Sequence, residues 1–341
     1  MNDRHDFASR SHDRASGFDV LSEVLRSVRL TGAMLFVVEA AAPWHSWAPR
    51  TDAFRRLVLP GCEHMVSYHI VTRGRCRAGL RAGEAVQLEA GDVLVVPHGD
   101  AYYLAEPPDA PPSYGPPEAL EFFRAMAAGE MAPLVVEGAG GAPEAQFICG
   151  FLGCDLKPFN PVLAALPRIV QLRGGAAAGE RLRHLVEFAL AALGAPLHPG
   201  GHGVLLRLAE LMFVELLRRH LEAHTAQTGW LAGLRDPLVG SALARLHGAP
   251  ARAWTLDALA AEVGTSRSVL AERFVQLVGA PPMHYLACWR MQLAARLLAD
   301  GSAKLRAVAD AVGYESEAAF SRAFKKACGV APALWRQRVA A

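Results

Sequence analysis

An internal repeat in the last third of the chain constrains the fold more than any other feature of the sequence. Residues 256–282 and residues 305–332 follow one residue pattern, with a single one-residue insertion in the second copy. The matched pairs, 49 residues apart before the insertion and 50 after it, are Leu256 and Leu305, Ala260 and Ala309, Val263 and Val312, Gly264 and Gly313, Ser266 and Ser316, Leu270 and Phe320, Phe274 and Phe324, Gly279 and Gly329, and Pro282 and Pro332. The chain therefore contains two copies of one structural unit.

Each copy has the residue order of a helix-turn-helix. A short Ala-rich helix ends at Gly264 or Gly313, because glycine can adopt the left-handed conformation that closes a helix. Ser266 and Ser316 then occupy the N-cap position of a second helix. The expected inner faces of the second helices are Leu270, Phe274 and Val278 in one copy and Phe320, Phe324 and Ala327 in the other. Small and charged residues on the opposite face favour entry into a DNA major groove; a helical hairpin repeat that only packs helices is the alternative.

The residues of the repeat also carry a family resemblance. The runs WTLDALAAEVGTSRSVLAERFVQLVGAPPMHYLACWRMQLAARLLADG and AKLRAVADAVGYESEAAFSRAFKKACGVAPALWRQ resemble the DNA-binding domain of AraC/XylS-type transcription regulators. The resemblance covers about residues 237–337 and is most specific in the second run. It implies an all-α domain with two helix-turn-helix units, joined by a rigid helix at about residues 283–298. Both recognition helices would then meet successive major-groove segments of double-stranded DNA.

The resemblance assigns DNA contacts to both recognition helices by position. The assigned residues are Arg267, Ser268, Ala271 and Glu272 in the first helix, and Glu317, Ala318, Ser321, Arg322 and Lys325 in the second. Glu272 departs from the family, which often has a basic or amide residue there. Unlike those residues, its carboxylate is repelled by DNA phosphate. Arg322 is the stronger candidate for a base contact, since a guanidinium can form two hydrogen bonds with guanine. The residues assigned to phosphates are Lys304, Arg306 and Lys326, together with Lys325. The alternative for each of these cations is a solvated basic surface.

The distribution of charge agrees with this division. The whole chain has 35 Lys+Arg and 33 Asp+Glu, a net charge of +2. Residues 236–341 have 13 Lys+Arg and 8 Asp+Glu, a net charge of +5, whereas residues 1–235 have 22 and 25, a net charge of −3. A basic segment in a nearly neutral chain indicates that one part meets a polyanion and the rest does not.

The pattern from about Met34 to Gln171 is that of β structure. The β-rich runs MLFVVEA, HMVSYHIVT, AVQLEA, DVLVVPH and AQFICGFLG are separated by glycine turns at Gly74, Gly83, Gly91 and Gly99. Short strands at this spacing predict an antiparallel sandwich or barrel. The proline-rich residues 107–117 are expected to form a loop, because proline lacks the N–H that a central strand needs.

Residues 32–172 also resemble, more loosely, the cupin-like sensor domain found in one branch of these regulators. The resemblance lies in the runs SYHIVTRGRC, LEAGDVLVVPHGDAYYL, ICGFLGCD and NPVLAALPRIVQL. It implies a small barrel that holds a ligand or serves as a sensor. The expected effector is a small molecule or a redox signal.

Three histidines in this segment are candidate metal ligands, because many cupins bind a metal through histidines and a carboxylate. The candidates are His64, His69 and His98. Metal-binding cupins have a further histidine shortly after the Pro-x-Gly turn, where this chain has Tyr102 and Tyr103. We therefore expect no cofactor and no enzymatic activity. A metal-binding cupin enzyme with a helical assembly domain is the competing interpretation.

Cys149 and Cys154 are candidates for a thiol switch. Their odd separation places the two side chains on opposite faces of a strand, which argues against a disulfide unless the intervening glycines bend the chain. A thiol reacts only when it is exposed and its pKa is lowered. Buried, inert cysteines are the alternative expectation.

Helical periodicity begins at about Ala176 and defines a connector. One apolar stripe contains Leu182, Leu185, Val186, Ala189, Leu190 and Leu193, and the next contains Leu205, Leu208, Ala209, Met212, Leu216 and Leu217. The two helices are expected to form an antiparallel pair that packs against the β domain, with some surface left for a second subunit. Packing within one chain is the alternative to a homodimer.

The sequence as a whole predicts a multidomain regulator that binds DNA at specific sequences. The expected parts are a disordered tail over residues 1–17, a sensor domain over 18–175, a helical connector over 176–235 and a DNA-binding domain over 236–341. Activation through RNA polymerase is the usual role in the resembled family. The N-terminus lacks the apolar core of a signal peptide, and no apolar run reaches the roughly 18 residues of a membrane span, so we expect a cytoplasmic protein with reduced thiols.

Overall fold

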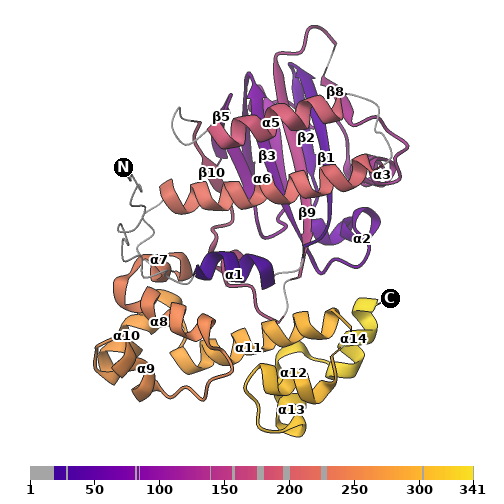
Figure 1. Ribbon diagram of the computed structural model, residues 1–341. Helices are drawn as coiled ribbons and strands as arrows, with labels where there is room; N and C mark the ends of the chain where they lie inside the picture. The colour runs from indigo at the N-terminus through magenta and orange to yellow at the C-terminus, as the bar shows by residue number, and fades with distance from the viewer. Residues whose placement is uncertain are drawn as a thin grey trace, which may run out of the picture.

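A computed structural model of the chain describes residues 19–27, 30–80, 83, 85–138, 140–155, 158–174, 180–194, 200–223, 229–301 and 303–340. The predicted tail over residues 1–17 lies outside these ranges. Two β-sheets form the N-terminal domain, two long helices lie across one of them, and eight helices of the described chain form the C-terminal domain (Figure 1). None of the described helices has the length and apolar content of a membrane span.

The N-terminal domain contains a six-stranded sheet with the order β10-β6-β3-β9-β1-β8 and a four-stranded sheet with the order β2-β7-β4-β5. The strands are β1 (Leu30–Ala41), β2 (Trp44–Ala48), β3 (His64–Arg73), β4 (Arg75–Leu80), β5 (Ala85–Glu89), β6 (Val93–Val96), β7 (Tyr102–Glu106), β8 (Leu134–Gly138), β9 (Ala145–Cys154) and β10 (Val170–Leu172). Each of the five predicted β-rich runs contains a strand or lies in one, although two of them extend past the strand end, and glycine turns separate the strands. The two sheets form a sandwich and do not close into a barrel. A sandwich of this kind is the architecture of a cupin-like domain.

The prediction of a purely antiparallel domain is wrong at one edge. Strand β8 pairs with β1 in parallel, with Val37 opposite Leu134, whereas the other pairs are antiparallel. A parallel pair needs a crossover connection. That connection contains helix α3 (Pro116–Ala127), which begins at the last prolines of the segment expected to be a loop. Proline suits the first turn of a helix, because the N–H that it lacks has no partner there.

The six-stranded sheet is covered on both faces, because alternate residues of its central strands enter different cores. In β9, Phe147, Cys149 and Phe151 point into the sandwich, whereas Ile148 and Leu152 point toward the helices. The covering helices are α5 (Glu180–Leu193) and α6 (Gly201–Ala223), as the apolar stripes predicted. Figure 1 shows both helices lying across the sheet.

A tyrosine anchors α6 to the sheet. The Tyr68 hydroxyl donates a hydrogen bond of 3.3 Å to the carbonyl of Ala209 on α6. Its ring crosses the backbone of Gly150 on the neighbouring strand, where an added Cβ would lie 2.1 Å from the ring. Any side chain at position 150 would therefore displace the tyrosine and loosen the contact between helix and sheet.

The C-terminal domain consists of two three-dimensional copies of the repeat around a shared helix. Its helices are α7 (Trp230–Arg235), α8 (Pro237–Gly248), α9 (Leu256–Glu262), α10 (Arg267–Val278), α11 (Pro282–Ala299), α12 (Leu305–Ala311), α13 (Glu317–Cys328) and α14 (Pro332–Ala340). Helix α11 matches the predicted linking helix to within one residue at each end. Helix α7, expected in the connector, packs against α8 and α10 and so belongs to the first unit.

The sensor domain and the first helix-turn-helix unit share one apolar core. Helix α1 (Val20–Ser27) contributes Val20 and Val24 to it and contacts α8 and α11. The Phe159 ring, just before α4 (Pro161–Ala165), meets the Tyr285 ring edge-on at 5.4 Å, and the Phe159 N–H donates to the Gln292 side chain at 3.0 Å. Figure 1 shows α1 between the sheets and the C-terminal helices. The second unit has a separate core.

Candidate nucleic-acid interface and sensor site

The two helix-turn-helix turns have the geometry that the repeat predicts. The Ser266 hydroxyl accepts a hydrogen bond from the Val269 N–H at 3.3 Å, and the Ser316 hydroxyl accepts one from the Ala319 N–H at 3.2 Å. Gly313 has a φ of +78°, and an added Cβ would lie 2.4 Å from the Ala251 carbonyl oxygen. Glycine is thus needed at this turn, both for its left-handed conformation and for the close approach of the loop after α8.

The inner faces of the recognition helices differ from prediction at one residue each. Helix α10 buries Leu270, Phe274 and Leu277, while the expected Val278 is only half-buried. Helix α13 buries Phe320, Phe324 and Cys328, while the expected Ala327 is exposed. The replacements keep the helical spacing of three or four residues, so the error lies in which neighbour completes the stripe.

The residues of these helices that were assigned to DNA contacts lie on their outer faces. Seven of them are exposed, namely Arg267, Ser268, Glu272, Glu317, Ala318, Arg322 and Lys325, and the other two, Ala271 and Ser321, are half-buried. In the repeat, Glu272 and Arg322 occupy equivalent positions. The two helices therefore present opposite charges at the same place, which would give the two halves of a bound site different base preferences.

The cations assigned to DNA contacts differ in whether other groups of the protein already bind them. Arg306 forms an ion pair with Asp310 at 3.0 Å and donates to the Glu315 carbonyl at 3.0 Å. Arg267 lies 3.8 Å from Asp257. By contrast, within the described ranges no acidic side chain lies at ion-pair distance from Arg322 or from the phosphate candidates Lys304, Lys325 and Lys326. These four exposed side chains therefore have no acidic partner within the described chain that would compete with DNA phosphate.

Two exposed valines were missed by the sequence reasoning. Val269 and Val275 lie on the outer surface of α10, each about half exposed. Apolar side chains on a recognition helix can contact the methyl group of thymine. The repeat contains a signal for one of them, since Val275 occupies the position equivalent to Lys325 on the outer face of the second helix.

Helix α11 holds the first unit together through a buried hydrogen-bond network. The Tyr285 hydroxyl lies 2.7 Å from the Trp230 indole nitrogen of α7 and 2.8 Å from His247 Nε2 of α8. Burial lowers the pKa of His247 to about 3, so its imidazole is neutral. The Arg290 guanidinium donates to two carbonyls of the loop between α8 and α9. These contacts fix the first unit to the helix that also supports the second.

The interior of the sandwich holds a small polar cluster. His69 lies with Nε2 2.6 Å from the Tyr102 hydroxyl and Nδ1 3.1 Å from the Cys149 sulfur. Burial lowers the pKa of His69 to about 3 and raises the pKa of the Cys149 thiol well above its ordinary value. The adjacent cavity has a volume of only about 30 Å³, which is room for one or two water molecules.

The three candidate metal ligands do not form one site. His69 lies in the sandwich interior, whereas His64 Nε2 lies 2.6 Å from the Pro97 carbonyl and His98 Nε2 lies 2.8 Å from the Leu166 carbonyl. The described residues contain no cluster of three His, Cys, Asp or Glu side chains that could hold a metal ion. The prediction of these three residues as a joint ligand set is therefore wrong. His64 and His98 lie near each other, but their Nε2 atoms bond to backbone carbonyls, and His69 lies apart in the sandwich interior.

The two candidate redox cysteines are separated, as the odd spacing predicted. Cys149 lies in the sandwich core and Cys154 in the core beneath the helices, and both are free thiols. Burial raises the pKa of both thiols. Neither has the exposure or the lowered pKa of a reactive thiol, so the structure favours the inert alternative.

Comparison with known proteins agrees with this architecture. A cupin family model matches residues 19–222, and a helix-turn-helix domain model matches residues 259–338. A putative AraC-like transcription regulator of Streptomyces lividans is 36% identical over 296 residues, which are 85% of this chain and 90% of the relative. A similar regulator of Streptomyces antibioticus is 36% identical over 83% of this chain and 90% of its own length. The transcriptional regulator AlkR of Acinetobacter baylyi is 25% identical over 94% of this chain and 99% of its own length.

The relatives that share both domains are transcription regulators, and their similarity covers the sensor domain as well as the DNA-binding domain. The interpretation as a metal-binding enzyme has no support from them. The chain therefore belongs to the family of AraC-like transcription regulators, and it is not an enzyme.

Proposed function

We propose that this regulator binds double-stranded DNA with α10 and α13 in successive segments of the major groove. The observation that carries the proposal is the pair of outward-facing recognition helices on a shared helix α11, with unpaired cations on the second. In this proposal Arg322 and the outer residues of α10 read bases. Lys304, Lys325 and Lys326 bind phosphates, and Arg306 joins them only by giving up its contact with Asp310.

Mapping the genomic binding sites of the full-length protein tests this function. The expected result is a set of sites with two conserved blocks about 10 base pairs apart, the spacing of adjacent major-groove segments on one DNA face. The blocks should differ in sequence, because Glu272 and Arg322 lie at equivalent positions. Binding that follows base composition alone, without a shared motif, would contradict the proposal.

The N-terminal domain is proposed to sense a small-molecule effector and to change the affinity for DNA. The shared core supports this coupling, because Phe159 of the sensor contacts Tyr285 and Gln292 on the helix that holds both units. An effector that favours one arrangement of this contact shifts the population of DNA-competent molecules.

We propose that the protein acts in the cytoplasm as an activator that contacts RNA polymerase, and that it needs no cofactor. The inert environment of Cys149 favours a small molecule over a redox signal.

A homodimer is proposed through the outer face of α5 and α6. Three large apolar side chains are exposed there, Phe188 at 53%, Val204 at 48% and Leu211 at 52%. Burying such a patch against a second copy would remove it from water.

Sedimentation of the protein at micromolar concentration should give a dimer, and Leu211→Asp should give a monomer, because it places a charge in the interface. Leu57→Asp, at an exposed leucine of α2 (Arg55–Val58), is the control and should stay dimeric. A monomeric wild type would contradict the proposal.

A further inference from the structure

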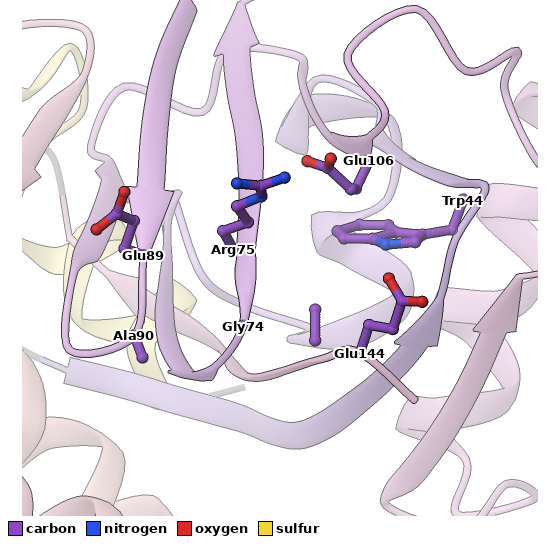
Figure 2. Close-up of a pocket in the computed structure, with 8 residues that line it drawn as sticks. Trp44, Gly74, Arg75, Glu89, Ala90, Glu106 and Glu144 are labelled. Atoms are coloured by element: carbon purple, nitrogen blue, oxygen red, sulfur yellow. The ribbon is translucent and has the colours of Figure 1, made fainter. Parts of the chain in front are cut away.

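An open groove at one end of the sandwich is not used by any of the contacts described so far. It has a volume of about 590 Å³, within the roughly 300–1,000 Å³ range of small-molecule sites. It lies where β2 and β4 begin and where β5 and β7 end (Figure 2). The interior cavity beside His69 is about 30 Å³. The groove, unlike the interior, is therefore large enough for an effector without rearrangement.

The charged groups of the groove are negative in sum and have no partners among the described residues. Glu89, Glu106 and Glu144 line it together with a single cation, Arg75, which gives a net charge of −2. Throughout the described ranges, none of these four side chains has an ion pair or a hydrogen bond. Figure 2 shows the carboxylates of Glu106 and Glu144 on either side of the Trp44 indole in that view. Unpaired carboxylates around one space attract a cation.

A buried tryptophan adds a hydrogen-bond donor to the same space. Trp44 is 1% exposed and is held by stacking on Phe147, with ring centroids 5.4 Å apart, and by backbone pairing with Glu106. Its indole N–H has no hydrogen-bond partner among the described residues, yet it is not one of the buried nitrogen atoms sealed from solvent. The N–H therefore faces the groove and is available to an acceptor atom of a ligand.

The floor of the groove is closely packed and held by backbone hydrogen bonding. Gly74 has a φ of +76°, and an added Cβ would lie 2.2 Å from the Glu144 carbonyl oxygen. The Glu144 N–H donates at 2.9 Å to the Ala40 carbonyl, which fixes the same segment from the other side. The carboxylate of Glu144 thus projects from a backbone that is already in place, so ligand binding need order only its side chain.

We infer that this groove binds a small organic cation that carries hydroxyl groups, such as a hydroxylated amine. The ammonium donates to the Glu106 and Glu144 carboxylates, and a hydroxyl oxygen accepts from the Trp44 indole N–H. A second hydroxyl accepts from Arg75, and Glu89 keeps the outer part of the groove negative. The inference rests on the proposed function in one respect: the groove is the effector site only if the N-terminal domain is a sensor.

Calorimetry of the full-length protein without DNA tests the inference, with glucosamine as the probe and glucose as its neutral counterpart. The two sugars differ only in an amine that replaces a hydroxyl. At a pH where the amine is protonated, glucosamine should bind at least about tenfold more tightly than glucose, and the preference should shrink as salt is added. In a ¹⁵N spectrum, the indole N–H signal that Trp44→Phe removes should shift on binding.

Glutamate-to-glutamine variants, which keep the side-chain shape and remove the charge, provide a second test of the inference. Glu106→Gln combined with Glu144→Gln removes two charges and should weaken glucosamine binding at least about tenfold, whereas Glu118→Gln, an exposed glutamate on α3 outside the groove, should leave it unchanged. The inference is overturned if glucosamine does not bind, if glucose binds equally well, or if the double variant binds glucosamine like the wild type. Because DNA is absent, those outcomes leave the proposed DNA-binding function standing. Failure to find operator sites would contradict that function and leave the groove's affinity unaffected.

Discussion

Arg322→Ala is expected to weaken binding to the cognate operator by about 1–3 kcal/mol, or roughly 5- to 150-fold in Kd. The side chain is exposed on the outer face of α13 and has no ion pair in the described part of the chain. Its guanidinium can form two hydrogen bonds with one guanine, and alanine leaves that base without a partner. Titration of the variant against the operator and against operators substituted at single positions measures both affinity and specificity. The loss should be confined to operators that keep the guanine.

Lys326→Ala is the matched control for this prediction. Lys326 lies on the same helix with the same charge, but it is assigned to phosphate. Its removal should weaken binding to all sequences alike. It should also reduce the slope of log Kd against the logarithm of salt concentration by about one. If Arg322→Ala behaves in the same way, with unchanged discrimination between operators, then Arg322 is a phosphate contact and base reading belongs to other residues.

Phe324→Ala should lower the free energy of unfolding of the second helix-turn-helix unit by about 3–5 kcal/mol. The side chain is fully buried, 5.6 Å from the Phe320 ring and 5.8 Å from the Trp335 ring. Alanine would leave a cavity at the centre of the small core that α12, α13 and α14 form with the end of α11. Because this core is separate from the larger one, the second unit should open while the first stays folded.

Hydrogen exchange measured helix by helix can detect such a local effect. Amides of α12 to α14 should exchange faster in the variant, and amides of α8 to α10 should exchange as in the wild type. Leu334→Ala is the control within the same unit, because Leu334 is 43% exposed, and it should change stability by less than about 0.5 kcal/mol. Equal exchange of both units in Phe324→Ala would show instead that the two units unfold together.

Features set by neighbouring residues were predictable from the sequence. Ser266 and Ser316 cap helices through bonds to residues three positions ahead, and helical spacing alone identifies Phe274 and Phe324 as core residues. Helix α11 followed from the family pattern. In the β domain, alternation and glycine turns located the central strands, because each strand is a short local pattern.

Features that depend on distant partners were not predictable. The parallel pairing of β8 with β1 follows from a crossover that no local pattern encodes. The groove is assembled from strand ends far apart in the chain, so Trp44 and Glu106 gave no joint signal, although they pair across β2 and β7. Likewise, the histidines appeared to be a ligand set in the sequence, whereas the fold places His69 in the sandwich interior and bonds His64 and His98 to backbone carbonyls.

The continuous core between the sensor and the first unit limits how such proteins can exchange parts by recombination. Val20 and Val24 lie near the start of the chain and Phe159 lies in its middle, whereas Tyr285 and Gln292, which Phe159 contacts, lie near its end. A gene fusion that joined a foreign sensor at residue 236 would inherit one side of this contact without the other. We therefore expect altered loops of the existing sensor to give new effector specificities more readily than a replaced domain. The second unit, with its separate core, is expected to tolerate change independently.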